Sequence, residues 1–191
     1  MAPRSETYAF KIAKGRSHEA MSFLGQMDDQ SRRLLEDLRG ATAAELQWQP
    51  RKGANTIGML LAHIAVVEVY WLQVATGNVS EQGLRKVLGI GSEDDGLPLA
   101  RDAGPPAALR GRTLAFYAKR LARARSHVAA IYRKYRDADL DRVITRTRRN
   151  GQVTHQSVRW ILYHVLEHEA GHYGQILLLR HLYRDRNKRG A

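Results

Sequence analysis

Residues 160–176, WILYHVLEHEAGHYGQI, combine a helical pattern with an unusual number of histidines. Through this segment runs a row of positions spaced alternately by four and three, which is the spacing of an inward-facing helix surface in a bundle. The row consists of Ile161, Val165, His168, His172, Gln175 and Leu179. Three members are polar where apolar residues are expected, and burying a polar group without a partner costs about 1–3 kcal/mol. The pattern therefore predicts a helix whose inner face contributes to a binding site.

The same periodicity occurs in three other segments of the chain. Together with the helix that contains residues 160–176, they give four expected helices, which cover residues 17–39, 56–75, 106–136 and 157–183. Ser17, Thr56 and Ser157 are suitable N-cap residues for three of them. Pro105 and Pro106 stand at the start of the helix at 106–136, where proline is tolerated. Four helices of this length, each with one apolar seam, are typical of a four-helix bundle.

Two connections depart from simple up-and-down topology. Residues 76–104 are rich in Gly, Asp and Pro, which predicts a long crossover loop with at most a short helical piece. Asn150-Gly151 lies between alternating residues, a strong signal for a β-hairpin. The sequence thus predicts an all-α fold: a four-helix bundle with a long crossover loop between its second and third helices and a small β-hairpin before the fourth. We divide the chain into an N-terminal extension (1–16), the bundle (17–183) and a basic C-terminal tail (184–191).

The histidines of two expected helices suggest a metal site. His168 and His172 are four residues apart, so they project from one helix face and can reach a single ion. His63, in the expected helix at 56–75, lies on an inward-facing seam as well. One histidine on an apolar face is more often a satisfied core residue than a ligand. Three imidazoles from two facing helices, with one coordination position left open, are instead typical of a catalytic zinc site.

Two other residues near these histidines, His164 and Glu169, each allow two interpretations. His164, one turn before His168, is either a ligand in place of His172 or a group that hydrogen-bonds a ligand, and we favour the second. Glu169 completes the string H-E-x-x-H, but Gln175 and Leu178 occupy the positions of the Gly and His in the extended protease pattern. Glu169 is therefore either a general base near metal-bound water or an exposed acid paired with an arginine. The remaining histidines are expected at the surface: His18, His127, His155 and His181.

Composition narrows the classes of function. The chain has 191 residues and no cysteine, which excludes disulfides, a Cys-ligated metal and a thiolate nucleophile of its own. We find no continuous run of about 18 apolar residues and no leader-like start, so we expect a cytoplasmic protein without a membrane span. The net charge of +12 indicates either an anionic partner or a solvated basic surface.

Basic and aromatic residues each allow two interpretations. The expected helix at 106–136 has nine basic residues and no acid from residue 110 to residue 136, a stripe that could follow nucleic-acid phosphates, although no recognition motif accompanies it. The hairpin residues Arg146, Arg148 and Arg149 either form a rim for an anionic substrate or protect a strand edge. Trp71 either forms the wall of a pocket or packs in the core.

Residues 45–71, ELQWQPRKGANTIGMLLAHIAVVEVYW, and residues 160–176 together resemble the DinB-like superfamily of metal-binding helical bundles. The most specific feature is the string H-x-x-x-H-x-G-Q-I with a helical histidine upstream. This string consists of His168, His172, Gly174, Gln175 and Ile176. The resemblance implies a divalent ion, zinc or nickel, held here by His63, His168 and His172. We expect zinc first, with nickel or iron as alternatives.

The resemblance also implies an activity. Characterised members include thiol S-transferases that use bacillithiol or mycothiol, and a mycothiol-dependent maleylpyruvate isomerase. We therefore expect a thiol S-transferase that acts with a low-molecular-weight thiol. The basic charge favours a small, anionic substrate, and we expect a homodimer because bundles with spare apolar loop surface often dimerise. The alternatives are a metal-dependent hydrolase with Glu169 as base, and a non-catalytic metal-binding or nucleic-acid-associated stress protein.

Overall fold

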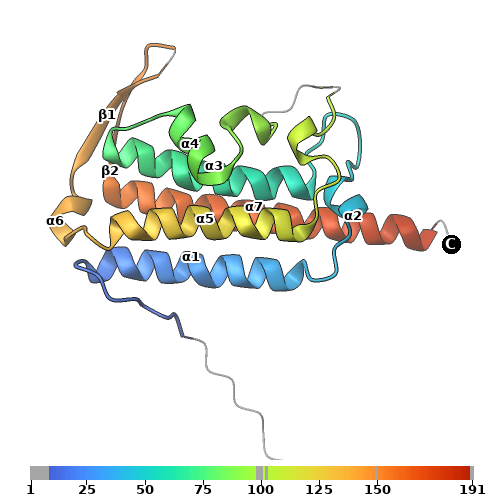
Figure 1. The fold of residues 1–191 in the computed structure, drawn as a ribbon, viewed down its shortest axis with the longest axis horizontal. Helices are drawn as coiled ribbons and strands as arrows, with labels where there is room; N and C mark the ends of the chain where they lie inside the picture. Colours follow the sequence, from blue (N-terminus) through green and yellow to red (C-terminus); the bar gives the residue numbers. More distant parts are fainter. Residues whose placement is uncertain (1–8, 98–100, 102, 149, 190–191) are drawn as a thin grey trace, which may run out of the picture.

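Four long helices form the body of the computed structural model, which describes residues 9–97, 101, 103–148 and 150–189 (Figure 1). They are α1 (His18–Asp37), α3 (Ile57–Thr76), α5 (Leu114–Tyr132) and α7 (Val158–Arg189). Helix α3 packs against α5 and α7, and α1 packs against the same two helices from the other side. Each long helix thus has two long neighbours. The prediction of a mostly helical fold with a small hairpin is confirmed.

Short elements connect the long helices. They are α2 (Ala43–Gln47), α4 (Glu81–Leu88), the 3₁₀ helices η1 (Ser92–Asp94) and η2 (Ala107–Leu109), and α6 (Asp137–Leu140). Helix α4 and η1 lie in the predicted crossover segment. Both pack on α3, and α4 also contacts α5. Ser80 caps α4 by accepting a hydrogen bond from the Gly83 amide, and Gly89 ends it with a φ of 72°. The part of the crossover segment that contains α4 and η1 therefore packs against the long helices. As a result, Asp95, the residue after η1, lies over α3.

The hairpin consists of β1 (Val143–Thr147) and β2 (Val153–Ser157), which pair in antiparallel fashion. Gly151 has a φ of 81°, a left-handed conformation that glycine adopts without steric cost. Part of the connection, Arg149, lies outside the described residues. The Asn-Gly signal therefore marked the hairpin correctly.

Two of the predicted helices had wrong boundaries. Helix α5 begins at Leu114 rather than at residue 106, because Gly111 has a φ of 66° and separates η2 from α5. It ends at Tyr132 rather than at residue 136. Helix α7 continues to Arg189 instead of stopping at residue 183, since no glycine or proline interrupts residues 177–189. It therefore extends into the segment that we assigned to the tail.

Helix α3 is the central helix of the core. Fifteen of its 20 residues are buried, including apolar residues on almost every side. By length and mean hydropathy α3 would be able to cross a membrane, but 78% of the apolar window is buried inside the protein. Helices that are apolar all round are buried ones, and here the neighbouring helices supply the apolar surroundings.

The N-cap of α3 provides a test of this architecture. Thr56 is buried, and its Oγ1 accepts a hydrogen bond from the Met59 amide at 3.1 Å. Thr113 holds the N-cap position of α5 without a side-chain cap hydrogen bond. We expect Thr56→Ala to lower the free energy of unfolding by about 1 kcal/mol, and Thr113→Ala by less than half of that. Urea unfolding followed by circular dichroism measures both, and equal effects would contradict this description of the cap.

Candidate metal centre

Three histidines from two helices meet at the interface of α3 and α7. The Nε2 atom of His168 lies 3.1 Å from the Nε2 of His63 and 3.1 Å from the Nε2 of His172. All three candidate ligand atoms lie within 4.8 Å of one another. The structure therefore brings together the three residues that the sequence analysis singled out. We call them the histidine triad.

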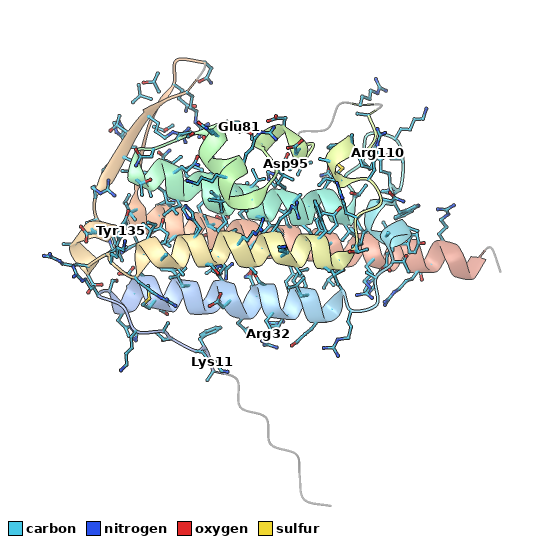
Figure 2. All side chains as sticks on the ribbon, viewed as in Figure 1. Lys11, Arg32, Glu81, Asp95, Arg110 and Tyr135 are labelled. Carbon is cyan, nitrogen blue, oxygen red and sulfur yellow. The ribbon has the colours of Figure 1, made fainter. Side chains whose placement is uncertain are left out.

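Neighbouring oxygen atoms orient two rings of the triad. The Asp95 carboxylate, buried directly after η1, accepts a hydrogen bond from His63 Nδ1 at 2.8 Å. Figure 2 labels Asp95 on the crossover segment next to α3. The Gln175 side-chain carbonyl accepts from His172 Nδ1 at 2.9 Å. A proton on Nδ1 leaves the Nε2 of a neutral imidazole as a lone-pair acceptor. Both rings therefore direct lone pairs toward His168.

Proton counting shows that these atoms suit a cation. A neutral His168 has at most one proton on Nε2, and it can donate this proton to only one of its two neighbours. In the other short Nε2–Nε2 contact, two lone pairs then face each other without a proton between them. Burial, followed by the charges of His172 and His63, lowers the pKa of His168 to about 3, and burial also lowers the pKa of His172. Extra protons are therefore disfavoured, and a divalent metal ion is the chemical partner that satisfies three converging imidazole nitrogens.

Glu169 lies in the core and not at the surface. Its side chain is 1% exposed, and it accepts hydrogen bonds from the Ser31 hydroxyl and from Arg125, the latter at 3.2 Å. The interpretation as an exposed acid was wrong about exposure, although the residue does pair with an arginine. Gln175 also differs from expectation, because it is exposed rather than buried. The role of Glu169 as a base stays a prediction, and its observed contacts do not favour it.

The contacts of Glu169 belong to a cluster of polar residues that joins all four long helices. This core ion cluster consists of Ser31 (α1), Glu68 (α3), Arg125 (α5) and Glu169 (α7). Arg125 Nε donates to Glu68 at 2.7 Å, and Nη1 reaches the exposed Asp28 at 2.8 Å. Burial lowers the pKa of Arg125, but the charges and hydrogen bonds of these carboxylates raise it above its ordinary value overall. Burial raises the pKa of Glu169 to about 7, against the effect of the Arg125 charge.

The other candidate residues lie outside the triad. The His164 ring stacks on Trp160 with a centroid distance of 4.8 Å and an interplanar angle of 6°. Its centroid is 6.1 Å from that of His168, and Trp71 contacts it edge-on at 5.0 Å. His164 therefore packs in an aromatic group instead of replacing His172 in the triad. The remaining histidines are exposed, as predicted: His18, His127, His155 and His181.

Comparison with known proteins identifies the family. A family model described as the DinB superfamily matches residues 26–176. The chain belongs to this family. DinB proteins form a metal-binding family, which agrees with the chemistry of the triad.

One similar solved structure supports the assignment at the level of the fold. It is the crystal structure of a conserved protein from Enterococcus faecalis, with a TM-score of 0.60 and 18% identity. The match covers 85% of this DinB chain and 95% of that protein. A comparison with curated protein sequences finds no match.

The carboxylate that orients His63 allows a graded test of metal binding by this DinB protein. Removing a hydrogen-bond partner of a metal ligand typically weakens metal affinity by about 10–100-fold. We expect that loss for zinc in Asp95→Ala, measured by competition with a chromophoric chelator. The control is Asp94→Ala at the neighbouring position, the last residue of η1, since Asp94 contacts Arg85 and the Gly91 amide instead of the triad. Equal zinc affinities for the two variants would contradict the orienting role of Asp95.

Proposed function

We propose that this DinB protein is a four-helix-bundle enzyme that depends on a divalent metal ion, and that it is a thiol S-transferase acting with a low-molecular-weight thiol. The observation that carries the proposal is the convergence of three histidine Nε2 atoms from two facing helices. In two of these histidines, His63 and His172, the Nδ1 atom is bonded to an oxygen acceptor. Three protein ligands leave a coordination position open, as in catalytic rather than structural zinc sites.

His63, His168 and His172 would hold the ion, zinc first and nickel or iron as alternatives. Bound there, a divalent ion supplies Lewis acidity that lowers the pKa of a thiol or of water. Asp95 and Gln175 keep the ring tautomers and orientations that this site requires. The chain has no cysteine, so the attacking sulfur has to come from a cosubstrate.

A hydrolase with Glu169 as base is less well supported. The Glu169 carboxylate is buried and bonded to Ser31 and Arg125, whereas a general base needs hydrogen-bond access to the group whose proton it takes. A transferase that imports a thiol has no need of a base on that side of α7. The geometry therefore supports thiol transfer better than hydrolysis assisted by Glu169.

A fluorogenic thiol-conjugation assay tests the proposal. The zinc-loaded chain is combined with monochlorobimane and, in turn, bacillithiol, mycothiol, glutathione or cysteine. We expect conjugation with at least one thiol to exceed the uncatalysed rate, to disappear on chelation and in His168→Ala, and to persist in Glu169→Gln and in the exposed-residue control His127→Ala. Metal-dependent hydrolysis of 4-nitrophenyl acetate without any thiol conjugation would contradict the transferase and favour the hydrolase.

A further inference from the structure

Four aromatic side chains form a continuous group beside the histidine triad. They are Tyr70 and Trp71 on α3, and Trp160 and His164 on α7. The rings of Trp71 and Trp160 meet edge-on at 5.7 Å, and those of Tyr70 and Trp71 meet edge-on at 5.8 Å. We call these four residues the aromatic group. Trp160 remains 40% exposed although it stacks on His164, so part of its ring surface is open to a ligand.

The aromatic group continues along the same pair of helices as the triad. His164 is one turn from His168, with ring centroids 6.1 Å apart. Trp71 follows His63 by eight residues, a separation of about 12 Å along the helix axis. A ligand one or two rings long that lies on this group can therefore extend toward the triad. Aromatic rings favour offset stacked or edge-to-face contact with other rings at such surfaces.

One arginine adds a charge to this aromatic surface. Arg146, on β1, donates from Nη2 to the Tyr70 hydroxyl at 2.5 Å. Its guanidinium carbon lies 5.4 Å from the Tyr70 ring centroid and 5.7 Å from that of Trp71. Arg146 is partly buried. Tyr70 and Trp71 thus hold the guanidinium over α3.

Among the described residues, no carboxylate lies within ion-pair distance of Arg146. In contrast, Arg125 contacts Asp28, Glu68 and Glu169, and Arg180 contacts Glu45. A guanidinium has five N–H donors in a planar fork that matches a carboxylate. One donor is used by Tyr70. The remaining donors are therefore available to an anionic group that lies on the aromatic surface.

We infer that the aromatic group and Arg146 bind an aromatic carboxylate, with its ring against Trp160 and Trp71 and its carboxylate on Arg146. The inference deepens the proposed function and rests on it, since this ligand would be the substrate presented to the triad. The hairpin then serves to position a recognition residue. Of the two interpretations of its arginines, substrate recognition applies to Arg146.

Isothermal titration calorimetry with two matched probes tests the charge requirement. The probes are naphthalene-2-carboxylate and the uncharged 2-naphthylmethanol, titrated into the full chain both zinc-loaded and chelator-treated. We expect the carboxylate to bind at least about tenfold more tightly than the alcohol. The preference should survive chelation, because Arg146 and not the ion holds the carboxylate. Equal affinities for the two probes, no saturable binding, or a preference present only with zinc would overturn the inference.

Variants locate the binding surface. Arg146→Gln should weaken binding of the carboxylate about tenfold and leave binding of the alcohol unchanged. Arg146→Lys should recover part of this loss. The control Arg148→Gln, at an exposed position on the same hairpin, should bind both probes as the wild type does. Trp160→Ala should weaken both probes, unlike the control Tyr163→Ala at an exposed aromatic position on the same helix. The inference would be overturned if Arg146→Gln and Arg148→Gln had equal effects on probe binding, or if Trp160→Ala and Tyr163→Ala did.

Zinc affinity measured on the same variants separates this inference from the proposed function. Intact zinc binding together with lost probe discrimination contradicts only the aromatic-carboxylate site. Probe discrimination in a wild-type chain that binds no zinc contradicts only the proposed function.

Discussion

His168→Ala is expected to weaken zinc binding by roughly 100-fold or more, beyond the 10–100-fold effect typical of losing an outer hydrogen-bond partner. His168 is the central ring of the triad, because its Nε2 is the atom that lies 3.1 Å from both other Nε2 atoms. Its removal leaves two imidazoles without the nitrogen between them. Competition with a chromophoric chelator gives the affinity, and elemental analysis of the purified protein gives the stoichiometry.

Two histidine variants serve as controls for His168→Ala. His164 is one turn away in the same helix but stacks on Trp160, and His127 is exposed on α5. We expect both alanine variants to bind zinc as the wild type does, within a few-fold. A loss in His164→Ala as large as in His168→Ala would show that the ion is held elsewhere on α7, and would contradict the assignment of the triad.

Arg125→Met is expected to destabilise the folded chain by about 3–5 kcal/mol, the range for breaking a buried ion pair by removing one partner. The side chain of Arg125 is 11% exposed, and those of Glu68 and Glu169 are 1% exposed each. Without Arg125, two carboxylates in the core lose their shared counter-charge. Urea unfolding gives the change in the free energy of unfolding, and the wild type measured in the same buffer gives the reference.

The same helix provides a matched control, Arg123→Met, because Arg123 is exposed and lies two residues away on α5. We expect its effect to stay within about 0.5 kcal/mol, as for most surface substitutions. The combination of Arg125→Met with Glu68→Gln and Glu169→Gln should recover much of the stability, since it removes the uncompensated charges. A single Arg125→Met variant as stable as Arg123→Met would contradict the energetic importance of the core ion cluster.

Helix α7 shows how far periodicity determines a site. Its sequence contains two seams, which are rows of residues with the same alternating spacing. The first seam passes through His168, and the second passes through Glu169. The second seam consists of Val158, Leu162, Val165, Glu169, His172 and Ile176. All of its members except His172 are buried, so this seam faces the core more fully than the first. The first seam therefore indicates the histidines, whereas only the second seam predicts the burial of Glu169.

The sequence also contains a signal for the core ion cluster. Arg125 lies in the row Leu121, Arg125, Val128 and Tyr132, which is spaced by four, three and four. Opposite charges at seam positions of different helices predict a buried pair, because a lone buried charge is strongly unfavourable. The pairing of Arg125 with Glu68 and Glu169 can therefore be predicted from the sequence.

Asp95 is different, because it lies in a loop 32 residues from His63 in the chain. Loop segments have no periodicity that places a side chain, so only the folded crossover segment reveals which histidine this carboxylate contacts. The same holds for Arg146, whose contact with Tyr70 joins the hairpin to a helix 76 residues earlier in the chain. The partners of both residues depend on tertiary packing.

An anomalous difference map at the zinc edge, from crystals of the zinc-loaded wild-type chain, tests the central claim most directly. The account predicts one peak per chain between the Nε2 atoms of His63, His168 and His172, within coordinating distance of all three, with Asp95 still bonded to His63 Nδ1. A zinc peak at any other place, or the three rings in their present contacts with no metal density between them, would contradict it.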